Sequence, residues 1–303
     1  MLVSDFDYAL PEELIAQLPA DERENSRMLV LNRENNTLEH KRFYNITDYL
    51  DNNTLLVLNN TKVLPARLYG IKDTGAKIEV FLLEANKEKI WSCLIRPSKR
   101  IKIDTVIKIS DELSVKVLKR LEDDGEWLVE LIYEGDLFEI LHKVGNIPLP
   151  PYIERKMQTE EIKKLDFERY QTVYAKDEGS VAAPTAGLHF TNEILDKLKE
   201  KGVEITYITL NVGLGTFRPV KCEDILDHKM HSETFEITQE TADIINRAKA
   251  NGKKIVAVGT TTVRTLEAAA DKVGHIVPCQ KETDIFIYPG VELKFVDALI
   301  TNF

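Results

Sequence analysis

The amino-acid sequence predicts an α/β protein whose main domain is interrupted by an inserted all-β domain that closes into a small barrel. Apolar residues alternate at period two through much of 66–145, helix and strand patterns then alternate, and the proline-rich stretch 145–151 separates the two textures. Alternation on one face is what a closed barrel requires, whereas strand–helix–strand order favours a mainly parallel sheet. We therefore predict a discontinuous α/β domain at 1–65 and 146–303 around a barrel domain at 66–145.

The composition is that of an ordinary globular protein with an acidic balance. Of the 303 residues, 43% are hydrophobic and 30% are charged, and the formal net charge is −10. This length fits one large domain or two modest ones. The negative charge excludes a protein that coats nucleic acid through its bulk charge, because phosphates would be repelled. A local basic groove remains possible.

The cysteines and histidines form no metal or disulfide pattern. Cys93, Cys222 and Cys279 lie far apart, which excludes a disulfide framework and a thiolate zinc site and favours a reducing compartment. His228 and His231 lack a third spaced ligand, so we expect a solvated or substrate-facing loop and no metal. The sequence shows no export signal and no apolar stretch of the ~20 residues that span a bilayer. We expect a soluble, cytoplasmic monomer with no membrane partner.

Turn signals and apolar periodicity predict the individual elements. Pro11 opens a helix over 12–18, which Pro19 ends. Apolar runs and alternating apolar residues predict strands at 28–31, 55–58, 78–82, 91–95, 113–117 and 127–133.

The second half of the chain predicts a layer of strands and helices. A helix over 192–201 leads into a strand over 203–212, and a helix capped by Thr238 leads into a strand over 254–258. In such layers ligands bind beyond the carboxyl ends of the strands. The loops that follow these strands are therefore the first candidates for a functional site.

The loop after 203–212 contains two glycines and an arginine. Gly213 and Gly215 allow backbone N–H groups to approach a ligand, and Arg218 could hold a carboxylate or a phosphate. The loop is not the dinucleotide fingerprint, because Arg218 stands where the third glycine belongs and no helix follows. A tight glycine turn is the alternative interpretation.

Threonines open the helix predicted after the strand at 254–258. Thr260, Thr261 and Thr262, followed by Arg264, offer hydroxyls and free N–H groups to an anionic ligand. Simple N-capping by one of the threonines is the alternative.

The irregular loop 179–191 has room for a ligand around Pro184 and Gly187, and His189 ends it just before a helix. A histidine in this position is also typical of a packing or capping residue, which is the alternative to a role as acid or base.

A basic cluster lies in a predicted hairpin connection of the barrel, at Arg96, Lys99, Arg100 and Lys102. It predicts a patch that follows RNA phosphates despite the acidic chain. A solvated turn is the alternative.

Taken together, several motifs resemble those of the S-adenosylmethionine:tRNA ribosyltransferase-isomerases. The run Ala-Pro-Thr-Ala-Gly-Leu-His-Phe-Thr at 183–191 is too long to arise by chance. The resemblance covers nearly the whole chain, in order, and its segments are 170–175, 179–191, 212–220, 230–233, 259–267 and 299–303.

The resemblance implies an enzyme of the queuosine pathway. Such an enzyme moves the ribosyl part of S-adenosylmethionine onto 7-aminomethyl-7-deazaguanine at the wobble position of tRNA. The ribose is rearranged to an epoxycyclopentanediol, giving epoxyqueuosine, and adenine and methionine depart. The family also implies an α/β domain interrupted by a β-barrel, with S-adenosylmethionine as co-substrate and no bound prosthetic group.

This function suggests roles for the candidate residues. The threonine-rich helix start with Arg264 suits the methionine carboxylate. His189 is the candidate general base or acid, with Lys176 and Arg218 as electrophilic helpers. The other substrate-binding candidates, which would face the sulfonium, stack on the purine or hold the adenosine, are Tyr174, Pro184, Thr185, Gly187, Phe190, Gly213, Gly215, Thr216 and Phe217.

The chain departs from the family in two places. Asn211 stands where the family usually has a histidine, and because an amide does not titrate near neutrality we expect it only to form hydrogen bonds. Family members also continue past the closing Thr-Asn-Phe with a His-Leu-Pro step and an apolar helix, so we expect that the chain is shortened here.

Two other functions remain open. An S-adenosylmethionine-dependent RNA methyltransferase that uses the turn at 213–215 would release S-adenosylhomocysteine rather than adenine and methionine. A non-catalytic tRNA-binding protein built on the barrel would bind tRNA without changing its mass. The lack of an evident aromatic-rich basic strand surface in the sequence argues against the second.

Overall fold

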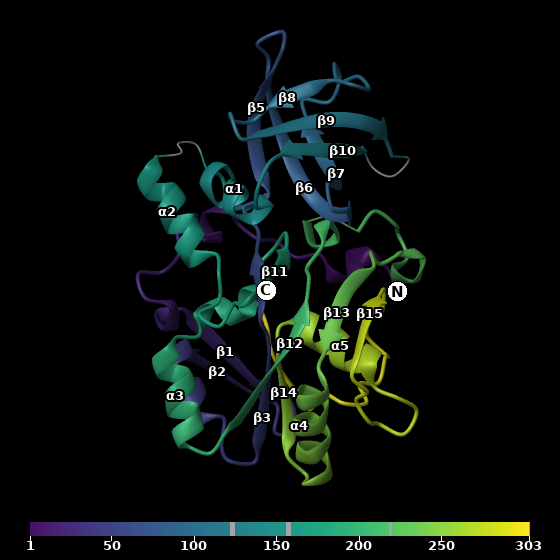
Figure 1. Cartoon of the computed structure of the whole chain (residues 1–303). Coiled ribbons are helices and arrows are strands. Elements are labelled where there is room, and N and C mark those ends of the chain that lie inside the picture. Colours follow the sequence, from purple (N-terminus) through teal and green to yellow (C-terminus); the bar gives the residue numbers. More distant parts are fainter. Residues whose placement is uncertain (122–124, 156–158, 218–219, 303) are drawn as a thin grey trace.

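The protein consists of a β-barrel, at the top of Figure 1, and an α/β body below it. The computed structural model describes residues 1–121, 125–155, 159–217 and 220–302. Both ends of the chain lie at the level where the two parts meet. The predicted combination of an α/β fold with a closed barrel is confirmed.

A six-stranded mixed sheet forms the centre of the α/β body, in the order β15-β13-β12-β3-β14-β16. Both faces of β3 are covered, so all six of its residues are buried. The strands predicted at 55–58, 203–212 and 254–258 are confirmed. The parallel strands are β12 (Glu204–Leu210), β3 (Thr54–Asn59), β14 (Lys254–Val258) and β16 (Ala298–Ile300), and β13 (Glu233–Ile237) and β15 (Cys279–Thr283) form an antiparallel edge.

Helices cover both faces of this sheet. The helices α4 (Gln239–Ala250) and α5 (Thr260–Ala269) pack on the side of Leu55 and Val57, whereas α3 (Asn192–Glu200) packs on the side of Leu56. As predicted, Thr238 caps α4, and its hydroxyl accepts a hydrogen bond from the Thr241 N–H at 3.2 Å.

The N-terminal segment corrects one prediction. In place of a helix over 12–18, only Glu12–Leu14 forms a single 3-10 turn (η2). Leu14 and Leu18 are 66% and 61% exposed, and a helical turn without an apolar partner is not stable in water. The other elements before β3 are η1 (Val3–Phe6), η3 (Arg23–Asn25), the hairpin of β1 (Arg27–Asn32) and β2 (Thr37–Arg42), which includes the strand predicted at 28–31, and η4 (Phe43–Asp48).

Six antiparallel strands close the barrel in the order β10-β7-β6-β5-β8-β9. The alternating residues predicted to face inward are buried there, and the helix α1 (Leu137–Val144) adds Leu137, Ile140 and Leu141 to the same core. The strands are β5 (Arg67–Lys72), β6 (Lys77–Lys87), β7 (Ile90–Arg96), β8 (Val106–Lys108), β9 (Leu113–Arg120) and β10 (Glu126–Tyr133). In the described part of the chain no helix is long and apolar enough to cross a membrane.

The two connections between barrel and α/β body run side by side. Arg67 and Asn146 exchange backbone hydrogen bonds at 3.1 and 2.9 Å. Beside them lie the short parallel strands β4 (Thr61–Val63) and β11 (Asp177–Ser180), and the helix α2 (Glu160–Arg169) follows the proline-rich connection. The domain boundaries at 65/66 and 145/146 stay a prediction.

The close approach of these connections depends on Gly145. A Cβ at this position would lie 2.0 Å from the Pro65 carbonyl oxygen and 2.7 Å from that of Leu141. Since both are backbone atoms, Gly145→Ala is expected to lower the free energy of unfolding by about 1–3 kcal/mol in urea titrations. Gly213→Ala is the control, because its Cβ would meet nothing closer than 3.9 Å. Equal stabilities of the two variants would contradict this explanation.

Candidate functional site

A cavity of about 240 Å³ lies beyond the carboxyl ends of β12, β14 and β16. It gathers loops that the sequence analysis selected separately. Two hydrogen bonds join the loop at 179–191 to the loop after β12. The Val212 N–H donates to the Ser180 hydroxyl at 2.9 Å, and the Val181 N–H donates to the Val212 carbonyl at 3.1 Å. The cavity is lined by Pro150, Tyr152, Tyr170, Ala183, Pro184, Thr185, Ala186, Val212, Thr216, Gly259, Thr260, Thr261, Thr301 and Asn302.

Five predicted substrate-binding residues therefore lie at one cavity. They are Pro184, which precedes η5 (Thr185–His189), Thr185 at the start of η5, Thr216 in η6 (Leu214–Phe217), and Thr260 and Thr261 at the start of α5. The structure thus brings these loops together at one rim of the sheet. Arg218 lies outside the described residues, and the side chain of Phe217 is not described either.

The N-terminus of α5 is open toward the cavity. Gly259 precedes the helix with φ of +87°, a conformation that favours glycine, and no described side chain caps it. The alternative of threonine capping is therefore not what is found. Thr262 is fully buried, and its hydroxyl donates to the Val258 carbonyl at 2.7 Å. Thr260 and Thr261 remain available to a ligand, whereas Thr262 is a core residue.

Asn59, at the end of β3, holds segments that line the cavity in place. It was not among the residues predicted from the sequence. Its amide oxygen accepts hydrogen bonds from the N–H groups of Thr61 and Leu210, each at 3.1 Å. Its amide nitrogen donates to the Leu210 carbonyl at 3.0 Å and to the Thr261 hydroxyl at 3.4 Å. The signal that could have identified it is a polar residue at the end of an otherwise apolar strand.

Replacement of Asn59 by leucine is expected to lower the free energy of unfolding and to loosen the residues that line the cavity. The change leaves two buried backbone N–H groups without acceptors, and each costs about 1–3 kcal/mol. Chemical denaturation should show the loss. If the variant unfolds like the parent protein, Asn59 does not have this supporting role.

Asn211 is held by hydrogen bonding beside the cavity. Its amide oxygen accepts a hydrogen bond from the Thr61 hydroxyl at 2.8 Å. A Cβ on Gly179 would lie 2.8 Å from the Asn211 amide nitrogen, so that glycine makes room for the side chain. The expectation that this position only forms hydrogen bonds agrees with these contacts.

Arg264 is turned away from the cavity and engaged elsewhere. Its guanidinium forms an ion pair with Glu233, and the two side chains are 12% and 5% exposed. It also donates to the carbonyls of Thr283 at 3.1 Å and Ile285 at 3.2 Å. Because these partners occupy its donors, Arg264 holds β13 and β15 against α5 and is not free to bind a ligand carboxylate.

The same ion pair orders the glycine loop. The Gly213 N–H donates to the Glu233 carboxylate at 3.0 Å. A Cβ on Gly215 would lie 2.6 Å from the His231 ring, so this glycine is where His231 packs. Neither glycine lines the cavity. Among the described residues no group of three or more His, Cys, Asp and Glu could hold a metal ion.

His189 lies behind the cavity and contacts one of its lining residues. Its Nε2 is 3.4 Å from the Asn302 amide nitrogen, and its ring packs against Phe43 with 5.4 Å between centroids. Burial lowers the pKa of His189 below its ordinary value of 6.5; a hydrogen bond with the Arg23 backbone partly opposes this shift, and the charge on Arg23 adds to it. The imidazole is therefore neutral near pH 7, the form that accepts a proton.

Four other predicted site residues are not at the cavity. Phe190 is fully buried in the core between the sheet and α3, and therefore cannot face a sulfonium. The Tyr174 hydroxyl is buried against Gly187, where a Cβ would lie 2.1 Å from it, so these two residues pack against each other. Burial raises the pKa of Tyr174. Lys176 is exposed and does not line the cavity.

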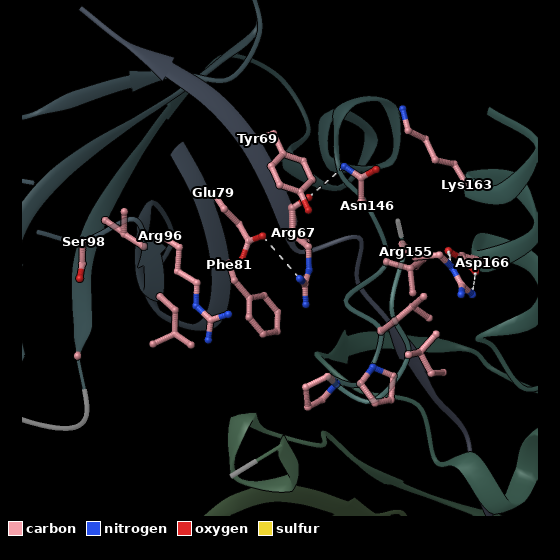
Figure 2. Close-up of a pocket in the computed structure, with 18 of the residues that line it drawn as sticks. Arg67, Tyr69, Glu79, Phe81, Arg96, Ser98, Asn146, Arg155, Lys163 and Asp166 are labelled. Atoms are coloured by element: carbon pink, nitrogen blue, oxygen red, sulfur yellow. Dashed lines mark hydrogen bonds and ion pairs between the residues drawn. The ribbon is translucent and has the colours of Figure 1, made fainter. Parts of the chain in front are cut away.

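A second, larger cavity of about 830 Å³ separates the barrel from α2 and the proline-rich connection (Figure 2). Arg67, Glu79 and Arg96 lie on the barrel side, and Arg155 and Asp166 lie on the facing side. Pro150 lines both cavities, so they are neighbours. Of the predicted RNA-binding residues only Arg96 lines this cavity, and Lys99, Arg100 and Lys102 are exposed on the β7–β8 connection.

The family of the chain follows from comparison with known proteins. A family model described as queuosine biosynthesis protein matches residues 3–303. The chain belongs to this family.

Curated relatives carry the name S-adenosylmethionine:tRNA ribosyltransferase-isomerase. One from Finegoldia magna is 52% identical over 305 residues, covering 100% of this chain and 86% of its own length. One from Fusobacterium nucleatum is 50% identical over 303 residues, covering 99% and 84%. A crystal structure of an S-adenosylmethionine tRNA ribosyltransferase from Thermotoga maritima is 37% identical, covers 99% of this chain and 84% of its own, and has a TM-score of 0.48. The resemblance inferred from the motifs is confirmed.

Proposed function

We propose that the protein transfers the ribosyl moiety of S-adenosylmethionine onto 7-aminomethyl-7-deazaguanine at the wobble position of tRNA and isomerises it, giving epoxyqueuosine-tRNA, adenine and methionine. The observation that carries this proposal is the meeting of the loops at 183–186, 212–216, 259–261 and 301–302 around one cavity. Membership of the queuosine biosynthesis family and relatives of that name support it. We also propose that the protein needs no prosthetic group and acts as a monomer in the cytoplasm.

The cavity suits one end of a sulfonium nucleoside. Sites for drug-sized ligands usually measure about 300–1,000 Å³, so a cavity of about 240 Å³ takes in only part of the co-substrate. The open N-terminus of α5 would receive the methionine carboxylate through backbone N–H groups and the hydroxyls of Thr260 and Thr261. The acceptor base would approach from the larger cavity, which adjoins at Pro150.

His189 would move the proton in this reaction. Loss of a proton from the acidic carbon next to the sulfonium makes that carbon a nucleophile for the rearrangement of the ribose, and adenine leaves more readily when it is protonated. A neutral imidazole can accept the first proton and then supply the second. Asn302 connects His189 to the cavity and would orient its ring.

The proposal is tested by mass spectrometry of a deazaguanine-bearing anticodon stem-loop incubated with S-adenosylmethionine and the protein. The expected result is an RNA that gains the epoxycyclopentanediol mass, with free adenine and methionine in equal amounts. S-adenosylhomocysteine together with a methylated RNA would identify a methyltransferase instead. RNA that binds but keeps its mass, whether or not S-adenosylmethionine is present, would identify a non-catalytic tRNA-binding protein.

A further inference from the structure

The outer surface of the barrel presents a continuous arginine and aromatic patch to the larger cavity. Neighbouring strands bring its residues together: Arg67 is opposite Phe81, and Tyr69 is opposite Glu79. Glu79 is in turn opposite Arg96 on β7. These residues point outward because the alternate residues Leu68, Val80 and Ile95 fill the barrel core. All five of the outward residues line the cavity.

The cavity is cationic although the chain as a whole is acidic. Of the described residues that line it, six are arginine or lysine and two are aspartate or glutamate. Each of these acids already has a partner in the cavity: Glu79 pairs with Arg67 at 3.6 Å, and Asp166 binds Arg155 at 2.7 Å. Among the described residues Arg96 and Arg120 form no ion pair, and both are exposed, with the Arg120 guanidinium over the Trp127 ring at 5.9 Å. Their charges are therefore available to an anionic partner.

Arg67 supplies a second sign that this surface is incomplete without a ligand. Its guanidinium lies over the Phe81 ring at 5.3 Å, while its Nε–H is buried and has no partner. Buried donors are almost always hydrogen-bonded in native proteins. Tyr69 stands on the same strand two residues later and is 44% exposed, which leaves its ring open for stacking.

We propose that this patch, formed by Arg67, Tyr69, Arg96 and Arg120, binds an unpaired segment of the RNA substrate. The ring of Tyr69 stacks on a base, and Arg96 and Arg120 hold the flanking phosphates. An aromatic ring with adjacent guanidinium groups suits single-stranded RNA rather than a duplex, which offers no free base faces. This inference rests on the proposed function, in which tRNA is the substrate. It locates RNA binding at the cavity wall rather than on the basic connection at 99–102.

The test compares binding of a fluorescent anticodon stem-loop by three charge-matched variants at several salt concentrations. Removal of two phosphate contacts in Arg96→Gln/Arg120→Gln is expected to reduce the slope of log affinity against log salt by about 1.4. Lys87→Gln/Lys119→Gln is the control, since both lysines are exposed on barrel strands and outside the cavity. Lys99→Gln/Arg100→Gln tests the basic connection, and we expect it to keep the parent slope.

Tyr69→Ala tests the stacking step separately. Loss of one stacked base is expected to weaken binding about 10-fold or more with little change of salt slope, whereas Tyr69→Phe should bind like the parent. Binding of S-adenosylmethionine and the melting temperature are measured in parallel and should not change.

The inference is overturned if the Arg96/Arg120 and Tyr69 variants bind the stem-loop like the parent, if only the 99–100 variant loses affinity, or if the parent protein does not bind RNA. Failure of the proposed function gives a different result, in which the parent binds RNA through this surface but releases no adenine.

Discussion

Glu233→Ala is expected to lower the free energy of unfolding by about 3–5 kcal/mol, because it leaves the buried Arg264 guanidinium without its counter-charge. The carboxylate also accepts the Gly213 N–H, so the loop after β12 loses its anchor in the same variant. That loop lines the cavity through Val212 and Thr216. Urea denaturation should show the loss of stability, and turnover should fall with it.

A double-mutant cycle of Glu233→Leu, Arg264→Met and the double variant separates the ion pair from its surroundings. The double variant should recover part of the stability, since an apolar pair leaves no buried charge, whereas the Gly213 N–H still lacks its acceptor. Lys199→Ala serves as a control, because its pair with Asp196 at 3.1 Å is largely exposed and should contribute at most about 0.5 kcal/mol. If Glu233→Ala costs no more than Lys199→Ala, the ion pair does not hold these segments together.

Sequence patterns with only one structural interpretation predicted the fold well. The run at 55–58 is apolar at every position, as a strand covered on both faces must be, and it became β3. The barrel strands were recognised where large apolar residues alternate over several positions. The two that were missed, β5 and β8, lack that signal: β8 has only three residues, and Gly70 interrupts β5, where a Cβ would lie 2.6 Å from the Lys108 carbonyl oxygen.

The helix predicted over 12–18 does not form, because the sequence pattern there has no tertiary partner. Its apolar spacing is helical, but helix formation in so short a segment depends on a tertiary partner. No local pattern contains that information. Leu14 and Leu18 remain exposed, and Gln17 instead joins the segment to 152–155 through its main chain and side chain.

The candidate site was predicted more reliably as a set of loops than as a set of side chains. Loop positions follow from strand order, so the loops at 212–216 and 259–261, which follow predicted strands, could be expected at the same edge of the sheet. The direction of a side chain depends on partners that are distant in sequence. Arg264 is committed to Glu233, which lies 31 residues away, and Phe190 fills the core under α3. Asn59 escaped notice because its partners, Leu210 and Thr261, lie 151 and 202 residues away.

The lowered pKa of His189 predicts a specific effect of pH on stability. Protonation of a buried group whose pKa lies below its unfolded value of 6.5 costs folding free energy. This contribution is fully present above pH 6.5 and is lost as the pH falls through the depressed pKa of the folded state. The stability of the parent protein should therefore fall more steeply below pH 6.5 than that of His189→Gln, and equal slopes would show that His189 does not titrate this way.

His189→Gln is also expected to reduce adenine release by about 10²- to 10⁴-fold, the contribution typical of a positioned acid or base. Because the active form is the neutral imidazole, the parent rate should stay constant as the pH falls to 6.5 and decline only below it. His40→Gln is the matched control, since His40 is exposed on β2 and should leave turnover unchanged. Asn302→Ala should lower the rate less than His189→Gln, because it removes the orientation of the ring but not the proton acceptor. Near-normal adenine release by His189→Gln would exclude His189 from the mechanism and leave Asn302 as a residue that only lines the cavity.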